Sequence, residues 1–372
     1  MTPLDRTRLL EALTLAESSF GLTEPNPRVG CVLGLADGSV LGRGATQQAG
    51  GPHAEVMALR DAAAAGHALA GATAWVTLEP CAHHGRTPPC CDALIEAGLA
   101  RVVVAIGDPF AQVAGAGLAR LREAGIEVVL ADADLAQAAR EVNIGFFSRV
   151  ERGRPWVRMK IAASLDGRTA LPNGVSQWIT GEPARRDGHA WRRRASAVLT
   201  GIGTVLEDDP RLVVRLVPTP AQPVRVVVDS RLQTPPAARL LQPPSHGLWI
   251  YAAHDDAARR LALQAQGAEV TLMPAENDKV DLVAMLGDLA RRGVNELHIE
   301  AGHKLNASLL REGLVDELLV YLAPTLLGDG REMAALGTLS ALADARRWRF
   351  TDLARVGDDV RLMARATAPD AG

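Results

Sequence analysis

The stretch TLEPCAHHGRTPPCC, residues 77–91, follows an apolar segment and contains three of the four cysteines of the chain. Upstream, GPHAE at 51–55 places a histidine two residues before a glutamate, where a helix-forming segment begins. Imidazole and thiolate groups are preferred ligands of Zn²⁺, and three protein ligands leave the fourth tetrahedral position open for water. We therefore expect a catalytic zinc site built from His53, Cys81 and a cysteine at position 90 or 91, with Glu55 as proton shuttle.

Spacing alone leaves parts of this site open. Cys90 and Cys91 both begin the next predicted helix, whose positive end favours thiolates. His83 and His84 are alternative fourth ligands. The competing interpretation is a structural zinc, or a core histidine among cysteines that pack as small hydrophobic residues. Cys31 lies in the middle of an apolar strand pattern and is expected to belong to the core.

The order H-x-E followed by P-C and a further cysteine is typical of zinc-dependent nucleobase deaminases. In that pattern two residues separate the cysteines, whereas here eight residues lie between Cys81 and Cys90. The insert is polar and basic, so it is suited to hold an anionic group of a substrate beside the metal.

Helical and extended patterns alternate along the first half of the chain. Helices are expected over 5–19, 53–65, 91–97 and 118–124, and strands over 30–35, 40–44, 74–78, 101–106 and 126–130. The first two strands are joined by a turn at Asp37-Gly38, which is a hairpin signal. This alternation predicts an α/β domain with helices covering a sheet.

The stretch ERGRP at 151–155 is charged and contains glycine and proline, so we expect domains at 1–150 and 151–372. The length of 372 residues also favours two domains. The second half alternates again, with strands expected at 156–162, 197–200, 224–229, 247–252, 269–272, 296–300 and 314–322. It is therefore expected to be a second α/β domain.

Composition narrows the classes of partner. A formal net charge of −3 gives no electrostatic reason to bind nucleic acid or an anionic membrane. No apolar run is long enough to predict a membrane span, and residues 1–18 have an amphipathic helix pattern without the features of a signal peptide. Clustered cysteines favour a metal site in the cytoplasm over secreted disulfides. We expect a cytoplasmic enzyme with a small-molecule substrate.

Along nearly its whole length the chain resembles the family of bifunctional deaminase-reductases of riboflavin biosynthesis. The resemblance is carried by PNPRVG (25–30), GPHAE (51–55), TLEPCAHHGRTPPC (77–90), KIAASLDGR (160–168), SQWIT (176–180), TVLEDDP (204–210) and EAG (300–302). It implies a three-layer, cytidine-deaminase-like first domain and a dihydrofolate-reductase-like second domain. A homo-oligomer, dimer or tetramer, is expected as well.

For the first domain the resemblance implies that His53, Cys81 and Cys90 hold one Zn²⁺, with Glu55 catalytic. The implied substrate is the phosphorylated pyrimidine 2,5-diamino-6-ribosylamino-4(3H)-pyrimidinone 5′-phosphate, whose ring amine is replaced by oxygen. Substrate-binding roles are implied for Asn26, His83 and Arg86. The alternative for Asn26 is a simple turn residue, and for His83 and Arg86 a solvated loop. Position 46 is threonine where relatives commonly have histidine.

For the second domain the resemblance implies reduction of the ribosyl group to ribityl by NADPH. The chain lacks a Rossmann fingerprint, so cofactor binding is expected instead where the strand at 296–300 runs into a helix. The implied NADPH contacts are Ala162, Trp178, Thr204, Asp208, Ser230, Gly302, His303, Lys304, Leu305, Asn306, Ala307 and Ser308. The implied contacts to the phosphorylated sugar are Ser176, Arg192, Leu212, Arg215 and Glu300. The alternative for Gly302, favoured by spacing alone, is an ordinary strand-to-helix turn, and the alternative for the arginines from 192 onward is a solvated helix face.

Overall fold

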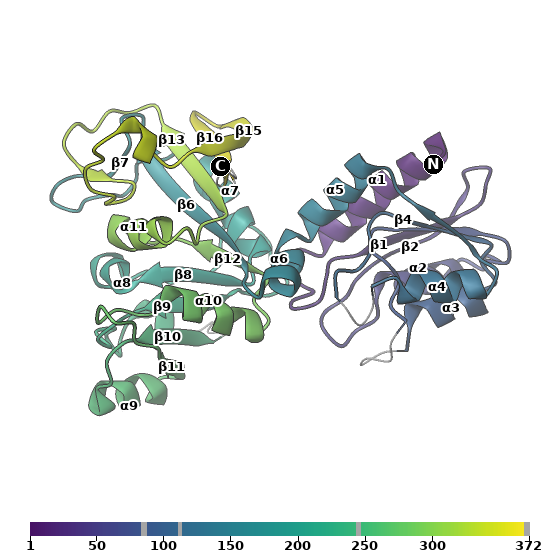
Figure 1. The fold of residues 1–372 in the computed structure, drawn as a ribbon, viewed down its shortest axis with the longest axis horizontal. Helices are drawn as coiled ribbons and strands as arrows, with labels where there is room; N and C mark the ends of the chain where they lie inside the picture. The colour runs from purple at the N-terminus through teal and green to yellow at the C-terminus, as the bar shows by residue number, and fades with distance from the viewer. Residues whose placement is uncertain (83–87, 111–113, 243–246, 368–372) are drawn as a thin grey trace. The chain divides into compact units, whose positions relative to one another are not determined.

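The computed structural model describes residues 1–82, 88–110, 114–242 and 247–367, which form two compact units, Met1–Arg154 and Pro155–Gly372 (Figure 1). In the first unit the elements are α1 (Pro3–Ser18), β1 (Gly30–Gly34), β2 (Val40–Ala45), α2 (Ala54–Ala64), β3 (Thr73–Val76), α3 (Cys90–Glu96), β4 (Arg101–Val104), α4 (Ala116–Glu123), β5 (Glu127–Leu130), α5 (Ala133–Val142) and α6 (Ile144–Arg152). Within the described residues no helix is long and apolar enough to span a membrane.

The first unit is a sheet between two helical layers. Its strand order is β2-β1-β3-β4-β5; β1 is antiparallel to both neighbours, and β3, β4 and β5 are parallel. Successive residues of a strand point to opposite faces. Val32, Trp75 and Val103 accordingly pack against α1 and α5. Alternate strand residues such as Leu33 and Val76 pack against α2, α3 and α4.

The second unit contains β6 (Trp156–Ser164), β7 (Arg168–Ala170), α7 (Glu182–Arg194), β8 (Ala197–Gly201), α8 (Ile202–Asp208), β9 (Val224–Val228), β10 (Leu248–Ala252), α9 (Ala257–Ala265), β11 (Ala268–Leu272), α10 (Leu282–Arg291), β12 (Glu296–Ile299), α11 (His303–Arg311), β13 (Glu317–Ala323), β14 (Arg331–Glu332), β15 (Trp348–Val356) and β16 (Asp359–Ala366). Short 3-10 turns occupy Arg239–Leu241 and Leu342–Asp344. Nine strands form one sheet in the order β11-β10-β9-β8-β12-β6-β13-β16-β15.

The strands from β11 to β13 in this sheet are parallel, and β16 and β15 extend it as an antiparallel hairpin. Helices α10 and α11 bury Met285 and Leu309 against one face. Helices α7 and α9 cover the other face, where Ala184 packs with Tyr321 and Leu263 with Ile250. Parallel strands end at the same edge, so the segments that follow β6, β8 and β12 meet there.

The predicted elements of the first half are present, with ends shifted by one or a few residues. Helices α5 and α6 and the hairpin of β15 and β16 were not predicted. The stretch 151–155 is only partly a linker, because Glu151 and Arg152 complete α6, which ends at Gly153 in the left-handed conformation. Arginines at the last turn of a helix interact favourably with its dipole, so charge alone does not indicate a linker.

Candidate functional site

The three zinc ligands that the family resemblance implies lie together in the first unit. The donor atoms of His53, Cys81 and Cys90 are all within 4.8 Å of one another. Nδ1 of His53 lies 3.2 Å from Sγ of Cys90 and 3.7 Å from Sγ of Cys81. Tetrahedral zinc, with bonds of about 2.1 and 2.3 Å to nitrogen and sulfur, holds such donors roughly 3.6 Å apart. The donor set and its spacing therefore fit Zn²⁺.

Two helix starts bring the ligands together. His53 is the residue before α2, and Gly44 of β2 lets that helix approach closely, since a Cβ at Gly44 would lie 2.1 Å from the carbonyl oxygen of Ala54. Cys90 is the first residue of α3, and its backbone N–H points at Sγ of Cys81, 3.3 Å away. That contact stabilises a thiolate at Cys81.

The charges at this site are coupled. Hydrogen bonds from Cys90 and His53 lower the pKa of Cys81 to about 4, and the proton shared between the two thiols raises the pKa of Cys90. Glu55 is buried in the first turn of α2, and its burial, together with the Cys81 thiolate, raises its pKa to about 7. A carboxyl group in this range can both take up and release a proton at neutral pH.

The remaining cysteines are accounted for by packing. Cys91 is fully buried, and its Sγ donates to the carbonyl oxygens of Pro80 and Gly117 at 3.2 and 3.5 Å, so it faces away from the ligand cluster. Of the two adjacent cysteines, Cys90 is therefore the one that lies in the cluster with His53 and Cys81. Cys31 is fully buried in β1, which confirms its expected place in the core.

The other described residues that the sequence analysis singled out in the first unit do not belong to the ligand cluster. Asn26 closes a turn with its backbone N–H on the carbonyl oxygen of Thr23, at 2.9 Å. Thr46 is buried, and its hydroxyl accepts the backbone N–H of Val29 at 3.2 Å. Its side chain therefore holds the residue that directly precedes β1. His83, Arg86 and the alternative ligand His84 lie outside the described residues.

Sequence reasoning missed Glu79, which stands two residues before the ligand Cys81. Its carboxylate is 4% exposed and accepts four backbone N–H groups, those of Asp108 (3.2 Å), Gly115 (3.1 Å), Gly117 (2.9 Å) and Leu118 (3.3 Å). The last three lie at the start of α4, whose N-cap residue, Gly115, has no side chain to cap the helix. The sequence signal that could have indicated this role is the position of the glutamate directly before Pro80-Cys81.

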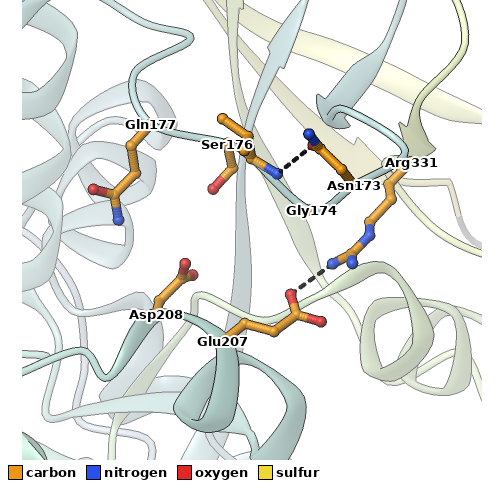
Figure 2. Close-up of a pocket in the computed structure, with 8 residues that line it drawn as sticks. Asn173, Gly174, Ser176, Gln177, Glu207, Asp208 and Arg331 are labelled. Atoms are coloured by element: carbon orange, nitrogen blue, oxygen red, sulfur yellow. Dashed lines mark hydrogen bonds and ion pairs between the residues drawn. The ribbon is translucent and has the colours of Figure 1, made fainter.

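In the second unit a pocket of about 420 Å³ lies between the segment that follows β7, the end of α8 and β14 (Figure 2). It is lined by Asn173, Gly174, Val175, Ser176, Gln177, Glu207, Asp208 and Arg331. Figure 2 shows Arg331 reaching Glu207, with Nη1 and Oε2 2.6 Å apart, while Asp208 points into the space beneath Gln177. Burial and the neighbouring Glu207 raise the pKa of Asp208. The pocket thus brings together Ser176 and Asp208, which the family resemblance places in the substrate and cofactor sites respectively.

A second cluster gathers three of the residues assigned to the phosphorylated sugar. Arg192 forms a bidentate pair with Glu300, Nε to Oε1 and Nη2 to Oε2, both at 2.8 Å, and its Nη1 donates to the carbonyl oxygen of Val213. Burial would raise the pKa of Glu300, but Arg192, His298 and Lys160 outweigh it and hold that pKa well below its usual range. Arg215 is exposed beside this pair.

The loop between these arginines is strained. Leu212 is buried and has a φ of 52°, in the left-handed region that leucine rarely adopts. Such strain is maintained only where surrounding contacts impose it, and it is often found at binding sites. The loop therefore holds Val213 and Arg215 in fixed positions next to Arg192.

The strand-to-helix turn expected to bind the cofactor is present at Gly302, the residue before α11. A Cβ at Gly302 would lie 3.7 Å from Oγ1 of Thr204, so these two predicted residues are neighbours. Asn306 and Ala307 are buried, and the Asn306 side chain donates to the carbonyl oxygen of Met333 at 3.0 Å. The helix thus presents its first N–H groups at the edge of the sheet and packs its next turn inward.

The pocket of Figure 2 does not include every residue that the family resemblance assigns to the cofactor site. Of the described residues, Ala162, Trp178 and Ser230 do not line it. Trp178 is 64% exposed and stacks under the guanidinium of Arg185 at 4.6 Å. The carbonyl oxygen of Ser230 accepts the backbone N–H groups of Ala253 and His254. His303, Lys304, Leu305 and Ser308 are at least partly exposed in the first turns of α11.

Comparison with known proteins agrees with this division into two halves. Residues 4–106 match the cytidine and deoxycytidylate deaminase zinc-binding region, and residues 155–362 match the RibD C-terminal domain. The chain is 45% identical to the riboflavin biosynthesis protein RibD of Escherichia coli, over 96% of this chain and 98% of that protein. The RibD of Mycobacterium tuberculosis is 40% identical, over 95% and 96%.

Solved structures show the same architecture. Acinetobacter baumannii RibD superposes with a TM-score of 0.88 at 39% identity, covering 98% of this chain and 99% of that one. A Thermotoga maritima protein described as a diaminohydroxyphosphoribosylaminopyrimidine deaminase and 5-amino-6-(5-phosphoribosylamino)uracil reductase gives 0.87 at 31% identity, with coverage of 98% and 99%. The expected fold class, a cytidine-deaminase-like domain followed by a dihydrofolate-reductase-like one, is confirmed.

Proposed function

The chain belongs to the RibD family of riboflavin biosynthesis proteins, and on this premise we propose the two reactions that it catalyses and the residues that carry them. Residues 1–150 form the domain that deaminates 2,5-diamino-6-ribosylamino-4(3H)-pyrimidinone 5′-phosphate hydrolytically. Residues 151–372 form the domain that reduces the ribosyl group of the product with NADPH, which yields 5-amino-6-ribitylaminouracil 5′-phosphate. The observation that carries the proposal is the convergence of His53, Cys81 and Cys90 beside the buried Glu55.

In the deaminase domain His53, Cys81 and Cys90 would hold Zn²⁺. When bound, the ion would supply the Lewis acidity that makes water a better nucleophile at neutral pH. Glu55 would take the proton that water gives up and deliver it to the ring nitrogen and then to the departing ammonia. Its burial excludes bulk water, so the proton stays with the reacting groups. Asn26, His83 and Arg86 are proposed to bind the pyrimidine and its phosphate.

In the reductase domain NADPH supplies the hydride when bound. The N-terminus of α11, from Gly302 through Ser308, together with Thr204, is proposed to face the diphosphate, because free backbone N–H groups and the helix dipole favour anions there. Ala162, Trp178, Asp208 and Ser230 are proposed as further cofactor contacts. Ser176, Leu212, Arg215 and the Arg192–Glu300 pair are proposed to hold and orient the phosphorylated ribose.

A coupled assay on one sample tests both halves. Zinc content, ammonia release and NADPH oxidation are measured for the wild type and for Glu55→Gln. We expect the variant to keep its zinc and lose ammonia release by about 10²- to 10⁴-fold, the usual contribution of general acid–base catalysis. NADPH oxidation on supplied deaminated phosphate should be unchanged. Full ammonia release by zinc-loaded Glu55→Gln would refute the role of Glu55, and absence of NADPH oxidation by the wild type would refute the reductase assignment.

The cysteines of the chain bear on the compartment in which the protein works. Four free cysteines, two of them in the ligand cluster, fit a reducing compartment, so we propose a cytoplasmic location. A homo-oligomer, dimer or tetramer, is proposed for the native protein. Sedimentation equilibrium of the purified full chain measures the oligomer directly, and a monomer at micromolar concentration would contradict it.

A further inference from the structure

His189 is a buried side chain in the reductase domain that the proposed function does not use. It lies on α7 three residues before Arg192, so the two side chains share one face of the helix. Its side chain is buried, and the residue is 5% exposed. Nδ1 of the ring accepts the backbone N–H of Arg215 at 3.2 Å. Because Nδ1 is an acceptor, a neutral ring carries its proton on Nε2.

The other ring nitrogen, Nε2, has no hydrogen-bond partner in the described part of the chain, which omits 83–87, 111–113, 243–246 and 368–372. Nε2 is not itself a fully buried atom, so this nitrogen opens to solvent although the side chain as a whole is buried. An N–H donor that opens to solvent next to the exposed Arg215 is available to an anionic ligand.

The charges around the ring keep it neutral. Burial, Arg192 and Arg215 lower the pKa of His189 to about 3, while Lys160 adds to this effect and Glu300 opposes it. These side chains come from four different segments: α7, the loop after α8, β6 and the end of β12. The ring is thus a neutral N–H donor at any pH at which the enzyme works.

The same neighbours attract an anion. Arg215 is exposed at the surface, and its pKa is lowered by partial burial of its guanidinium and by repulsion from Arg192, Arg239 and Arg211. Arg192 is buried and its charge is paired with Glu300, so the positive charge that is open to a ligand comes mainly from the exposed arginines. A phosphate oxygen placed between Arg215 and the ring would neutralise part of this charge and accept the free Nε2–H.

We propose that His189 binds the 5′-phosphate of the reductase substrate, donating a hydrogen bond from Nε2 while its Nδ1 fixes the backbone of Arg215. The proposal rests on the proposed function, which places the phosphorylated ribose in this cluster. His189 acts here as a specificity-determining residue, because it recognises the phosphate and not the ring or the cofactor.

Two conservative variants separate the roles of the two ring nitrogens. In His189→Asn the side-chain oxygen lies near the place of Nδ1 and can still accept the Arg215 N–H, but the donor is lost. In His189→Gln the amide nitrogen lies near the place of Nε2 and keeps the donor. For each full-length enzyme we would measure kcat/KM for NADPH oxidation with 5-amino-6-ribosylaminouracil 5′-phosphate and with its dephosphorylated form, and take the ratio.

We expect His189→Asn to lower kcat/KM for the phosphorylated substrate by about ten- to hundred-fold, the loss typical of one hydrogen bond to a charged group. The dephosphorylated substrate should be nearly unaffected, and His189→Gln should recover most of the ratio. Equal losses on both substrates, or an unchanged ratio in His189→Asn, would overturn the proposal. Arg215→Ala separates it from the proposed function: if that variant also leaves the ratio unchanged, the phosphate site itself has been misplaced.

A measurement on the wild type covers the case in which His189→Asn does not fold. Inorganic phosphate is titrated into the full chain labelled with nitrogen isotope in histidine, and the Nε2–H resonance of His189 is followed. The proposal predicts that phosphate shifts this resonance and slows its exchange with water, at the concentration at which phosphate competes with substrate. An unchanged resonance at that concentration would overturn it.

Discussion

Glu79→Gln is the sharpest perturbation of the metal-bearing loop that leaves every ligand in place. The carboxylate shares its four N–H partners between two oxygens: Oε1 serves Gly117 and Leu118, and Oε2 serves Asp108 and Gly115. A glutamine has one oxygen, so two N–H groups would face an NH₂ group that cannot accept. The two lost bonds, each to a charged group, correspond to about 3 kcal/mol at the lower end of the usual range.

This loss should be local. We expect the amides at the start of α4 to exchange with solvent about 100-fold faster, since 1.4 kcal/mol corresponds to a factor of ten. The segment Pro80-Cys81 follows Glu79 directly, so zinc affinity should also fall, by the 10- to 100-fold typical of residues that orient metal ligands. Hydrogen-exchange mass spectrometry of residues 114–123 and competition with a chelator measure the two effects.

The matched control is Glu127→Gln on the edge strand β5. Its carboxylate is 65% exposed and lies 3.4 Å from Arg101, so its loss should cost less than about 1 kcal/mol and leave zinc affinity unchanged. If the α4 amides of Glu79→Gln exchanged at the same rate as those of the control, and the two variants bound zinc with the same affinity, the Glu79 carboxylate would not organise the loop and the reasoning would be refuted.

Gly117→Ala would place a Cβ 2.0 Å from the carbonyl oxygen of Pro80; we expect a loss of about 1–3 kcal/mol in urea unfolding, and unchanged stability would contradict the close approach. Arg192→Ala would leave the buried Glu300 without its bidentate partner, so we expect the free energy of unfolding to fall by about 3 kcal/mol and reductase activity to be lost. A decrease of less than about 1 kcal/mol, as for an exposed ion pair, would contradict the buried pair. Because the folded-state pKa of His189 is depressed to about 3, the unfolded chain binds its proton more readily, so this residue's contribution to stability is complete above about pH 6.5 and declines as pH falls towards 3. Urea unfolding from pH 7 to pH 4 should therefore show a smaller loss for His189→Asn than for the wild type; equal losses would mean that the ring is protonated in the folded state.

The metal centre could be predicted from sequence because its chemistry is local. His53 and Glu55 are fixed by one helix start, and Cys81 and Cys90 lie at either end of one loop. Residue type and spacing then suffice to predict the ligands. The exception is the choice between Cys90 and Cys91, which are adjacent in sequence and differ in the direction of their side chains. That direction is set by the packing of α3, in which the thiol of Cys91 donates to Pro80, and no local pattern reveals it.

Glu79 and His189 were missed for the opposite reason: their partners are distant in sequence. Glu79 meets amides 29 to 39 positions away, and His189 meets the amide of Arg215, 26 positions away. The carboxylate and the imidazole have no periodicity or motif that would indicate these partners, since backbone N–H groups are present at every residue. Such contacts follow only from the sheet order and from loops such as the strained one at Leu212.

Arg192 illustrates why residue type alone does not settle a role. An arginine in a phosphate-binding sequence context is expected to contact the anion directly, yet here the side chain is 9% exposed and three of its five N–H donors are engaged with Glu300 and Val213. A buried ion pair of this kind gains little stability on balance, because both groups lose their hydration. The pair fixes Glu300 at the carboxyl end of β12, and in the proposed function the exposed Arg215, with His189 beside it, contacts the phosphate. Charge neutralisation and recognition are thus divided between different residues of one cluster.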